Sequence, residues 1–295
     1  MKIKFYKYEA AGNDVLILKD EVLKHPLFKN PPNLRKFIKN LADRHFGVGA
    51  DEIAFLSFPK TENIDAKVTF FNSDGSGAQI CGNGLRCIAK HLYERNKKIH
   101  KKFLTILTDA GPKKCKVYPS KNGRVHRVIV DMGLPIKIDG TIEMPPVSKF
   151  KIPFSKLEGF ALSFGNPHAV IFEDIHENLK EKIWNELQKY QLFPEGVNVG
   201  YAVFESPRSI KLEVWERGCG PTLACGSGAC AAVTSAVSIG HCPFDVPVKV
   251  KMPGGTLRIK VRKKDFNVFI EGPVREIFEG AIEDVSYFFS SIARI

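Results

Sequence analysis

The sequence predicts an α+β fold of two pseudo-symmetric domains, each a mostly antiparallel β-sheet or barrel wrapped around a central helix. The main observation is a repeated stretch: residues 72–89 read NSDGSGAQICGNGLRCIA, and residues 216–233 read ERGCGPTLACGSGACAAV. In both copies a Cys-Gly-X-Gly sequence, at Cys81 and at Cys225, precedes an apolar run with helical spacing. The expected strands outnumber the helices and do not alternate strictly with them, which disfavours a doubly wound parallel sheet.

Two further sequence echoes keep nearly the same separation along the chain. Residues 11–17, AGNDVLI, resemble residues 164–171, FGNPHAVI. Residues 47–52, GVGADE, have a looser counterpart in residues 196–201, GVNVGY. A single Cys-Gly-X-Gly is typical of an ordinary turn before a helix, whereas several echoes at one separation indicate an internal duplication.

The predicted elements of the first half follow from its hydrophobic periodicity. Alternation of apolar and polar residues at the start of the chain predicts a strand, and the apolar spacing of residues 33–43 predicts an amphipathic helix. A second helix follows Cys81 and runs to about residue 95. The predicted strands are 2–8, 15–18, 51–58, 66–72, 103–108, 115–118 and 125–132.

The second half repeats this order after a proline-rich, irregular segment at 133–153. Helices are predicted over 179–190 and from Cys225 to about residue 239. The predicted strands are 158–164, 169–172, 197–205, 209–216, 246–252, 256–261 and 267–271. We therefore predict one domain over residues 1–127 and another over 128–272, with a tail, 273–295, that returns to the first domain.

The composition excludes several classes of protein. No stretch approaches the ~20 apolar residues of a membrane span, and the N-terminal residues show no secretory signal, so we expect a cytoplasmic protein with no membrane partner. Seven cysteines, an odd number, do not indicate a disulfide framework, and their spacing does not match a zinc site, so no metal is expected. The net charge of +12 comes from scattered lysines without interleaved aromatic residues, which predicts a solvated basic face and no nucleic-acid partner.

The chemistry follows from a cysteine placed at the start of each predicted helix. Unpaired N–H groups and the helix dipole favour negative charge there and can lower the pKa of a cysteine. A thiolate that removes a proton from one face of a carbon, and a thiol that returns one to the other face, would racemise or epimerise that carbon. Backbone N–H groups of the glycine loops would bind a substrate carboxylate. No pyridoxal site is evident, and this scheme requires no cofactor. Cys87 and Cys230, on the apolar runs, are predicted to be core thiols.

Motifs along the whole chain resemble those of the diaminopimelate epimerase family. They are AGND (11–14), GVGADE (47–52), NSDGS (72–76), CGNGLRC (81–87), GNPH (165–168), VNVG (197–200), ERG (216–218), ACGSGACA (224–231), MPGG (252–255) and EGPVREIFEG (271–280). The paired cysteine loops with GNPH and ERG are specific in combination. The resemblance implies that family's fold and a cytoplasmic, homodimeric isomerase that acts on a small-molecule substrate. The implied reaction is cofactor-independent conversion of LL-2,6-diaminopimelate into the meso isomer, in lysine and peptidoglycan biosynthesis.

The resemblance also implies roles for individual residues. Cys81 and Cys225 would be the two catalytic acid/base groups, and His168 and Glu216 would tune them. A charged Arg217 could grip a distant carboxylate with two hydrogen bonds. The residues implied to bind the substrate are Asn13, Glu52, Asn72, Gly82, Asn83, Asn166, Asn198, Glu216, Arg217, Gly226 and Ser227.

Several positions depart from the family pattern. Ala10 and Val15 replace a glycine and a phenylalanine that flank the AGND loop, and Pro221 replaces a glutamate. Glu52 stands near the reacting end where the family normally has glutamine, and this change leaves open a racemase or epimerase of the same fold that acts on another amino acid, such as histidine or a proline derivative. A non-enzymatic alternative, a basic cysteine-containing protein that binds nucleic acid or metal, would leave the duplicated loops unexplained.

Overall fold

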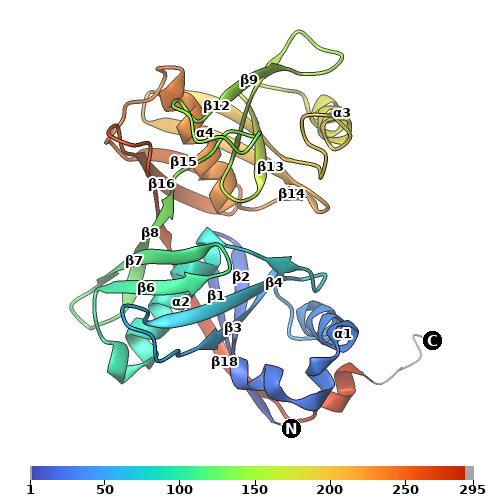
Figure 1. Ribbon diagram of the computed structural model, residues 1–295, viewed down its shortest axis with the longest axis vertical. Helices are drawn as coiled ribbons and strands as arrows, with labels where there is room; N and C mark the ends of the chain where they lie inside the picture. Colours follow the sequence, from blue (N-terminus) through green and yellow to red (C-terminus); the bar gives the residue numbers. More distant parts are fainter. Residues whose placement is uncertain (1, 290–295) are drawn as a thin grey trace. The chain divides into compact units, whose positions relative to one another are not determined.

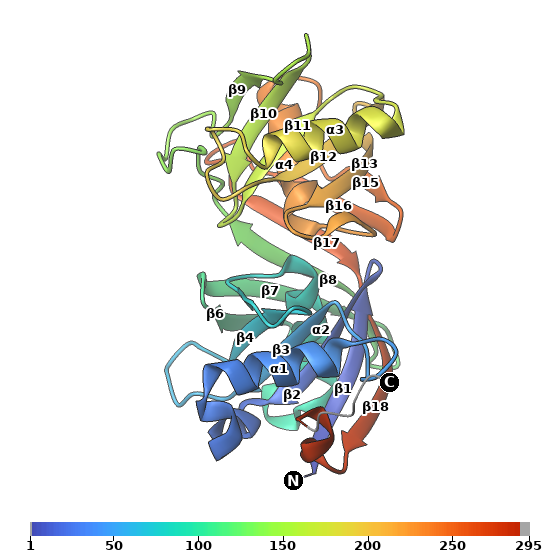
Figure 2. The ribbon, with the colours of Figure 1, turned by 90° about the vertical axis from the view of Figure 1, so that its right-hand side faces the viewer.

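A computed structural model describes residues 2–289 of the chain. Within this range the chain forms two compact units (Figures 1 and 2). Unit 1 consists of the residues up to Val128 together with those from Pro273 onward, and unit 2 of Ile129–Gly272. The predicted tail reaches residue 295, so its last six residues lie outside the described range.

Unit 1 is built on a mixed sheet in which most neighbouring strands are antiparallel. Starting from β18, the strands pair in the order β18–β1–β2–β3–β4–β6–β7, and the short β5 also pairs with β4. Two pairs, β2–β3 and β4–β6, are parallel. The strand bounds are β1 Ile3–Ala10, β2 Asn13–Lys19, β3 Glu52–Ser57, β4 Ala66–Asn72, β5 Gly77–Ala78, β6 Phe103–Thr108, β7 Gly111–Pro119, β8 Val125–Gly133 and β18 Arg275–Ile282.

Unit 2 repeats this pairing order. Its strands pair as β9–β10–β11–β12–β13–β15–β16–β17, with the short β14 on β13. The parallel pairs are β11–β12 and β13–β15, the counterparts of the parallel pairs in unit 1. The strand bounds are β9 Ser148–Lys151, β10 Glu158–Ser163, β11 Pro167–Ile171, β12 Asn198–Ser206, β13 Ser209–Glu216, β14 Gly220–Thr222, β15 Val248–Met252, β16 Gly255–Val261 and β17 Val268–Pro273.

One helix is enclosed by the strands of each unit. In unit 1, α2 (Gly82–Arg95) contacts β1, β2, β6 and β7, and its residues from Gly82 to Tyr93 are buried. In unit 2, α4 (Gly226–Ser238) contacts β10 to β13, β15 and β16 and is buried along almost all of its length. A helix that is buried on every side is a core element, so each unit has the predicted architecture of a sheet wrapped around a central helix.

A second helix covers the outer face of each sheet. Figure 2 shows α1 (Pro31–Ala42) across β2 and β3, and α3 (Glu177–Leu187) across β11 and β12. Phe37, Ile38 and Leu41 of α1 join the core of unit 1, together with apolar residues of both strands. Strands β2 and β3 therefore bury both faces, which explains their nearly continuous apolar sequences.

Some elements were not predicted from the sequence. Strands β5, β9, β14 and β18 are short or lie in segments read as irregular or as a tail, and the 3-10 turns η1 Asp20–Lys24, η2 Pro26–Lys29, η3 Lys97–Ile99 and η4 Val285–Phe288 were also missed. The two-residue and three-residue strands are shorter than a hydrophobic alternation can reveal. Strand β18 is mostly exposed, so it lacks the apolar pattern of a core strand.

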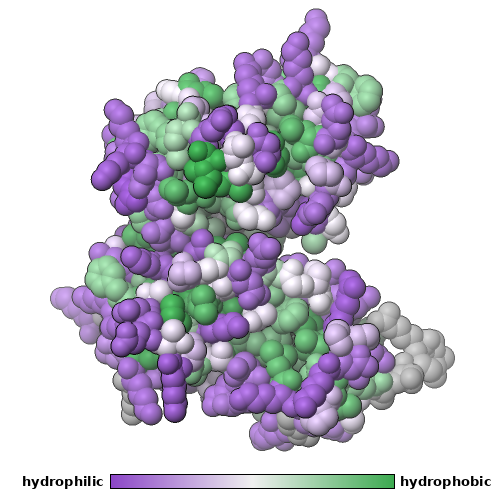
Figure 3. Space-filling view, in the orientation of Figure 1, coloured by the Kyte–Doolittle hydropathy of each residue, from purple (hydrophilic) through white to green (hydrophobic). Residues whose placement is uncertain are grey.

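The surface in Figure 3 is dominated by hydrophilic side chains with smaller hydrophobic patches between them. This agrees with the abundance of lysine and arginine in the chain, 44 residues against 32 aspartates and glutamates. None of the helices in the described residues is both long and apolar enough to cross a membrane.

Candidate active site

Cys81 begins the central helix of unit 1. It is the N-cap of α2, with an extended backbone, and its Sγ accepts a hydrogen bond of 3.1 Å from the backbone N–H of Gly84. The side chain is partly exposed. Because a side-chain acceptor at the N-cap satisfies one of the free N–H groups of the first helical turn, the sulfur takes the place that a serine or aspartate oxygen usually occupies.

Cys225 has the same position in unit 2. It is the N-cap of α4, and its Sγ accepts a hydrogen bond of 3.3 Å from the backbone N–H of Gly228. The Ser227 hydroxyl lies 3.5 Å from the same sulfur. Cys225 is only 5% exposed, so it is more enclosed than Cys81.

A cross-strand pair of polar residues accompanies each cysteine. In unit 1, Glu52 at the start of β3 pairs with Asn72 at the end of β4. In unit 2, Val199 pairs with Trp215 in antiparallel β12 and β13. The next register position places Asn198, the first residue of β12, opposite Glu216, the last residue of β13. Each unit therefore has one carboxylate and one amide at this position, but on exchanged strands.

The carboxylate of each pair raises the pKa of the cysteine thiol in its own unit. Burial, the negative charge of Glu52 and a hydrogen bond with Glu52 raise the pKa of the Cys81 thiol well above its usual value. Burial and the charge of Glu216 also raise the pKa of the Cys225 thiol, while hydrogen bonds from Ser227 and Gly228 oppose the rise. The helix terminus does favour each thiolate, as predicted, but burial and the carboxylate outweigh it, so the expected lowering of the pKa is wrong for both free thiols.

In unit 2 the GNPH loop contributes a buried histidine. His168 is 1% exposed, and its Nε2 lies 3.2 Å from Oδ1 of Asn166. Burial lowers the pKa of His168 to about 3, so the ring is neutral near pH 7. A neutral imidazole can orient a neighbouring amide or hold a proton at one nitrogen, but it adds no positive charge to this part of the unit.

Asn198 connects two of the predicted binding loops. Its Nδ2 donates to the carbonyl of Pro167 at 3.2 Å, and its Oδ1 accepts from the backbone N–H of Arg217 at 2.9 Å. These bonds fix the loop that carries Glu216 and Arg217 against the GNPH loop. Asn198 is thus placed mainly as a support, with one further N–H available on Nδ2.

The remaining polar candidates differ in how far their side chains are already engaged. Asn72 donates to the Ser76 hydroxyl at 2.9 Å, and the Arg217 guanidinium donates to the Glu195 carbonyl at 2.9 Å. Oδ1 of Asn13 is buried and has no hydrogen-bond partner among the described residues. Because a buried polar atom without a partner is costly, the Asn13 amide is well suited to receive a donor from a bound ligand.

Arg86 is a residue of this region that the sequence did not indicate. Its side chain is completely buried, and Nη2 donates to Oδ1 of Asn83 at 2.9 Å. The Asn83 amide oxygen is therefore engaged by Arg86 of the same helix, and Asn83 is buried. The sequence signal was ambiguous, because an arginine on an apolar helical run is ordinarily expected to reach solvent.

The other cysteines follow the prediction of core thiols where it was made. Cys87 and Cys230 are fully buried, and Cys115 and Cys242 are buried as well, whereas Cys219 is exposed. The described residues contain no group of three or more His, Cys, Asp or Glu side chains arranged to hold a metal ion.

Comparison with known proteins gives a consistent result across the chain. The family model described as diaminopimelate epimerase matches residues 5–138 and 160–277. The diaminopimelate epimerase of Methanococcus maripaludis strain C5 is 37% identical over 291 residues, covering 95% of this chain and 100% of the relative. That of Carboxydothermus hydrogenoformans is 37% identical over 284 residues, covering 94% and 98%. Among solved structures, a hydroxyproline epimerase from Agrobacterium vitis has a TM-score of 0.71 at 13% identity and covers 95% of this chain and 91% of that protein.

Proposed function

We propose that this chain, which belongs to the diaminopimelate epimerase family, converts LL-2,6-diaminopimelate into meso-diaminopimelate with two cysteines and no cofactor, in lysine and peptidoglycan biosynthesis. Family membership makes the chain an isomerase, so it replaces the non-enzymatic alternative. The observation that carries the mechanism is the equivalent placement of two thiols: Cys81 and Cys225 are both N-caps of the central helix of their unit.

In the proposed reaction the two sulfurs act on one α-carbon of the substrate from opposite faces. One cysteine, as thiolate, accepts the α-proton, and the other, as thiol, donates its proton to the carbon, so that the configuration inverts. The protonation states of the two sulfurs are exchanged at the end, and no other reactant is consumed. This division of roles is general acid/base catalysis by groups within reach of the reacting carbon.

The helix N-termini support the proposal through their free N–H groups. Gly82, Asn83, Gly226 and Ser227 are the first residues of the two helices, where backbone N–H groups have no partner within the helix. We propose that these groups bind the α-carboxylate and stabilise the negative charge that develops as the proton leaves. Alanine or a larger residue at Gly84 would also crowd this turn, since a Cβ there would lie 2.5 Å from the Phe70 ring.

The distant end of the substrate needs groups of both charges. Glu216 accepts a hydrogen bond of 2.7 Å from Thr222, and the Arg217 side chain is exposed beside it in sequence. We propose that Arg217 binds the distal carboxylate, that Glu216 binds an ammonium group, and that Asn13, Asn72 and Asn166 orient the rest. The proposal also includes the homodimer and the cytoplasmic location that the family resemblance implies.

The test is exchange of the α-proton in D2O, followed by NMR with reductant and without added cofactor. LL-diaminopimelate and a panel of L-amino acids are offered separately. We expect exchange and meso product with diaminopimelate only, and loss of both in Cys81→Ala and in Cys225→Ala. Cys242→Ala, which removes a buried thiol outside the proposed site, is the matched control and should keep full activity. Full activity in either site variant would contradict the two-cysteine mechanism.

A second candidate, a racemase or epimerase of another amino acid, is favoured by one observation. Glu52 adds a carboxylate beside Cys81, and this would change the charge balance near the reacting carbon. Exchange on histidine or a proline derivative, and none on diaminopimelate, would select this candidate. In that case Glu52→Gln would be the first substitution expected to restore exchange on diaminopimelate.

A further inference from the structure

The pairs formed by Glu52 with Asn72 and by Asn198 with Glu216 make the two cysteine environments similar but not equal. In unit 1 the carboxylate stands on the strand that follows the outer helix, and in unit 2 it stands on the next strand. Each carboxylate raises the pKa of the N-cap thiol of its own unit. Each cysteine therefore has one carboxylate acting on it, but the carboxylate comes from a different strand in each unit.

The Glu52 carboxyl is held close to the Cys81 loop. Its Oε2 is buried and lies 3.1 Å from the position that a Cβ would take at Gly84. Gly84 is the residue whose N–H donates to the Cys81 sulfur. The same sulfur thus has two polar neighbours: an N–H donor that favours the thiolate, and a carboxyl group that hydrogen-bonds it and favours the thiol.

Within residues 2–289, the Cys225 sulfur has a neighbouring hydroxyl group that has no counterpart at the Cys81 sulfur. The Cys225 sulfur has both the Gly228 N–H and the Ser227 hydroxyl within hydrogen-bond distance. The residue equivalent to Ser227 in unit 1 is Asn83, whose amide oxygen accepts a hydrogen bond from Arg86. Glu216 accepts a hydrogen bond from the Thr222 hydroxyl. Donors around a thiolate stabilise it, and a nearby anion destabilises it.

Other titratable groups act more weakly on the two sulfurs. Cys87 of α2 slightly raises the pKa of Cys81, and Cys230 of α4 slightly raises that of Cys225, so these contributions are alike in the two units. The acidic residues next to Glu52 in the same loops are paired: Asp14 and Asp51 both accept from Arg44, and Lys7 lies 2.9 Å from Asp14. The difference between the two cysteines therefore rests on Glu52 and Ser227.

We propose that Glu52 makes Cys81 the weaker acid of the two thiols in the free enzyme, so that Cys225 loses its proton first and serves as the base of the proposed reaction. The proton shared by the Cys81 sulfur and the Glu52 carboxylate stays on sulfur, because an ordinary carboxyl group is more acidic than a thiol by about four pKa units. No bond other than the S–H···O hydrogen bond is involved. At Cys225, Ser227 and Gly228 partly oppose the rise in pKa that burial and Glu216 cause. This inference rests on the two-cysteine function proposed above.

The test measures the titration of each thiol without substrate. The reduced enzyme is treated with iodoacetamide across a range of pH, and the alkylation rates at Cys81 and Cys225 are obtained separately by peptide mass spectrometry. The midpoint of each pH–rate curve reports the ionisation of that sulfur, whatever its accessibility. We expect the midpoint of Cys225 to lie below that of Cys81 in the wild type. In Glu52→Gln, which keeps the shape of the side chain, the midpoint of Cys81 should fall by about one unit or more.

Two variants separate charge from other effects. Glu52→Asp keeps the negative charge, and the midpoint of Cys81 should remain nearer to the wild-type value than in Glu52→Gln. Glu62→Gln removes a carboxylate from an exposed loop of the same unit and should leave the Cys81 midpoint unchanged. Circular dichroism confirms that each variant is folded.

The inference is overturned if Cys81 titrates below Cys225 in the wild type, or if Glu52→Gln leaves or raises the Cys81 midpoint. A rise would mean that Glu52 is itself protonated and donates to sulfur. These outcomes are read on the free enzyme, so they are distinct from a failure of the proposed function, which would appear as absent α-proton exchange.

Discussion

The central helices α2 and α4 begin alike at their cysteines but bury very different side chains. Counted from the N-cap, Arg86, Lys90 and His91 of α2 correspond to Cys230, Thr234 and Ser235 of α4, and all six residues are buried. One sheet-wrapped helix therefore carries cationic and titratable groups where its counterpart carries small ones. Since the two units share a strand order, the fold alone requires neither the cationic residues of α2 nor the small residues of α4.

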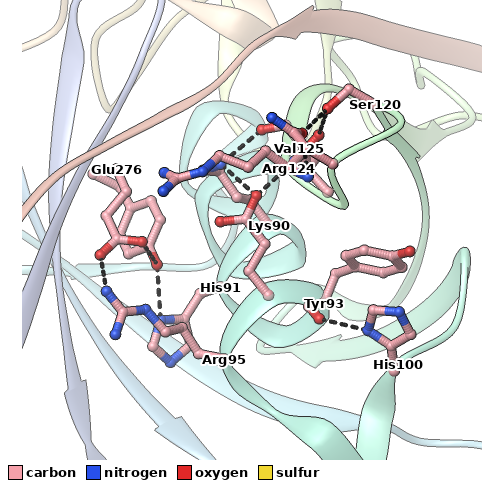
Figure 4. Close-up of polar contacts among 12 residues, drawn as sticks. Lys90, His91, Tyr93, Arg95, His100, Ser120, Arg124, Val125 and Glu276 are labelled. Atoms are coloured by element: carbon pink, nitrogen blue, oxygen red, sulfur yellow. Dashed lines mark hydrogen bonds and ion pairs between the residues drawn. The ribbon is translucent and has the colours of Figure 1, made fainter.

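Lys90 of α2 is buried together with its partners (Figure 4). Lys90 donates to Glu94 at 2.6 Å and to the carbonyl of Val125 at 2.7 Å. Arg86 donates to Asn83 and to the backbone carbonyls of Gly82 and Pro273. A buried charge is tolerated when such bonds replace its hydration, and these bonds tie α2 to segments that lie far from it in sequence.

A second set of polar contacts joins α2 to β18, the strand that returns to unit 1. His91 hydrogen-bonds the hydroxyl of Tyr8, which donates to Glu276 of β18 at 3.1 Å, and Arg95 pairs with the same carboxylate. Unit 2 is one continuous segment, Ile129–Gly272, and has no returning strand to secure. The comparison suggests a rule: the polar interior of α2 fastens a discontinuous unit, and the small residues of α4 suffice for a continuous one.

The largest expected effect comes from removing the buried guanidinium. Arg86→Met leaves the acceptors at Asn83, Gly82 and Pro273 without their donor, and at about 1 kcal/mol each this lowers the free energy of unfolding of unit 1 by ~3 kcal/mol. Cys230→Ala, the equivalent position of α4, should cost about 1 kcal/mol.

Hydrogen exchange of α2 peptides measures the stability of unit 1. Tryptophan fluorescence measures the unfolding of unit 2, since Trp184 and Trp215 both lie there. Equal losses from Arg86→Met and Cys230→Ala would contradict the rule drawn from the two helices.

Acidification is expected to weaken unit 1 through His91. Burial lowers the pKa of His91 from 6.5 to about 4. Because the unfolded chain binds this proton near pH 6.5 and the folded unit only near pH 4, stability is fully present above 6.5 and is lost as the pH falls toward 4. The loss amounts to roughly 2–3 kcal/mol. In His91→Gln this part of the pH dependence should disappear, as measured by urea unfolding between pH 7 and 4.

His168→Gln is the corresponding variant of unit 2. The loss of stability that it removes should continue to a lower pH than in unit 1, because the pKa of His168 is lowered to about 3. A wild-type unit 1 whose stability does not change between pH 6.5 and 4 would show that His91 is not a neutral buried group.

The glycines that donate to the two sulfurs sharpen the comparison at the site itself. A Cβ at Gly84 would lie 2.5 Å from the Phe70 ring, whereas one at Gly228 would lie 3.1 Å from Val214 and 3.2 Å from the Cys225 sulfur. Overpacking of this kind costs about 1–3 kcal/mol. Gly84→Ala should therefore lower the free energy of unfolding of unit 1 by about 2 kcal/mol, and Gly228→Ala that of unit 2 by about 1 kcal/mol or less. Hydrogen exchange of α2 peptides and tryptophan fluorescence measure the two losses. A greater loss in Gly228→Ala would show that the Cys225 turn is the less adaptable one.

The sequence predicted the architecture because its main signals are local. Glycines followed by an apolar run identified both helix starts at Cys81 and Cys225, and duplication supplied the pairing of the units' elements. It could not predict that Arg86 is buried, because burial of a cation depends on acceptors such as Pro273 that are distant in the chain. The influence of Glu52 on Cys81 likewise depends on strand register, which the sequence alone did not provide.

The smallest expected effect tests whether polar groups in α4 contribute anything. The Thr234 hydroxyl is fully buried and has no hydrogen-bond partner among the described residues, whereas Lys90 at the equivalent position has two acceptors. Replacing an unsatisfied hydroxyl by a methyl group removes a desolvation cost, so Thr234→Val should leave the stability of unit 2 unchanged or raise it by up to about 1 kcal/mol. Lys90→Met should instead lower that of unit 1 by about 2 kcal/mol, because Glu94 would lose its buried cation. If Thr234→Val were as harmful as Lys90→Met, the hydroxyl would have a partner such as a bound water, and α4 would depend on polar contacts as α2 does.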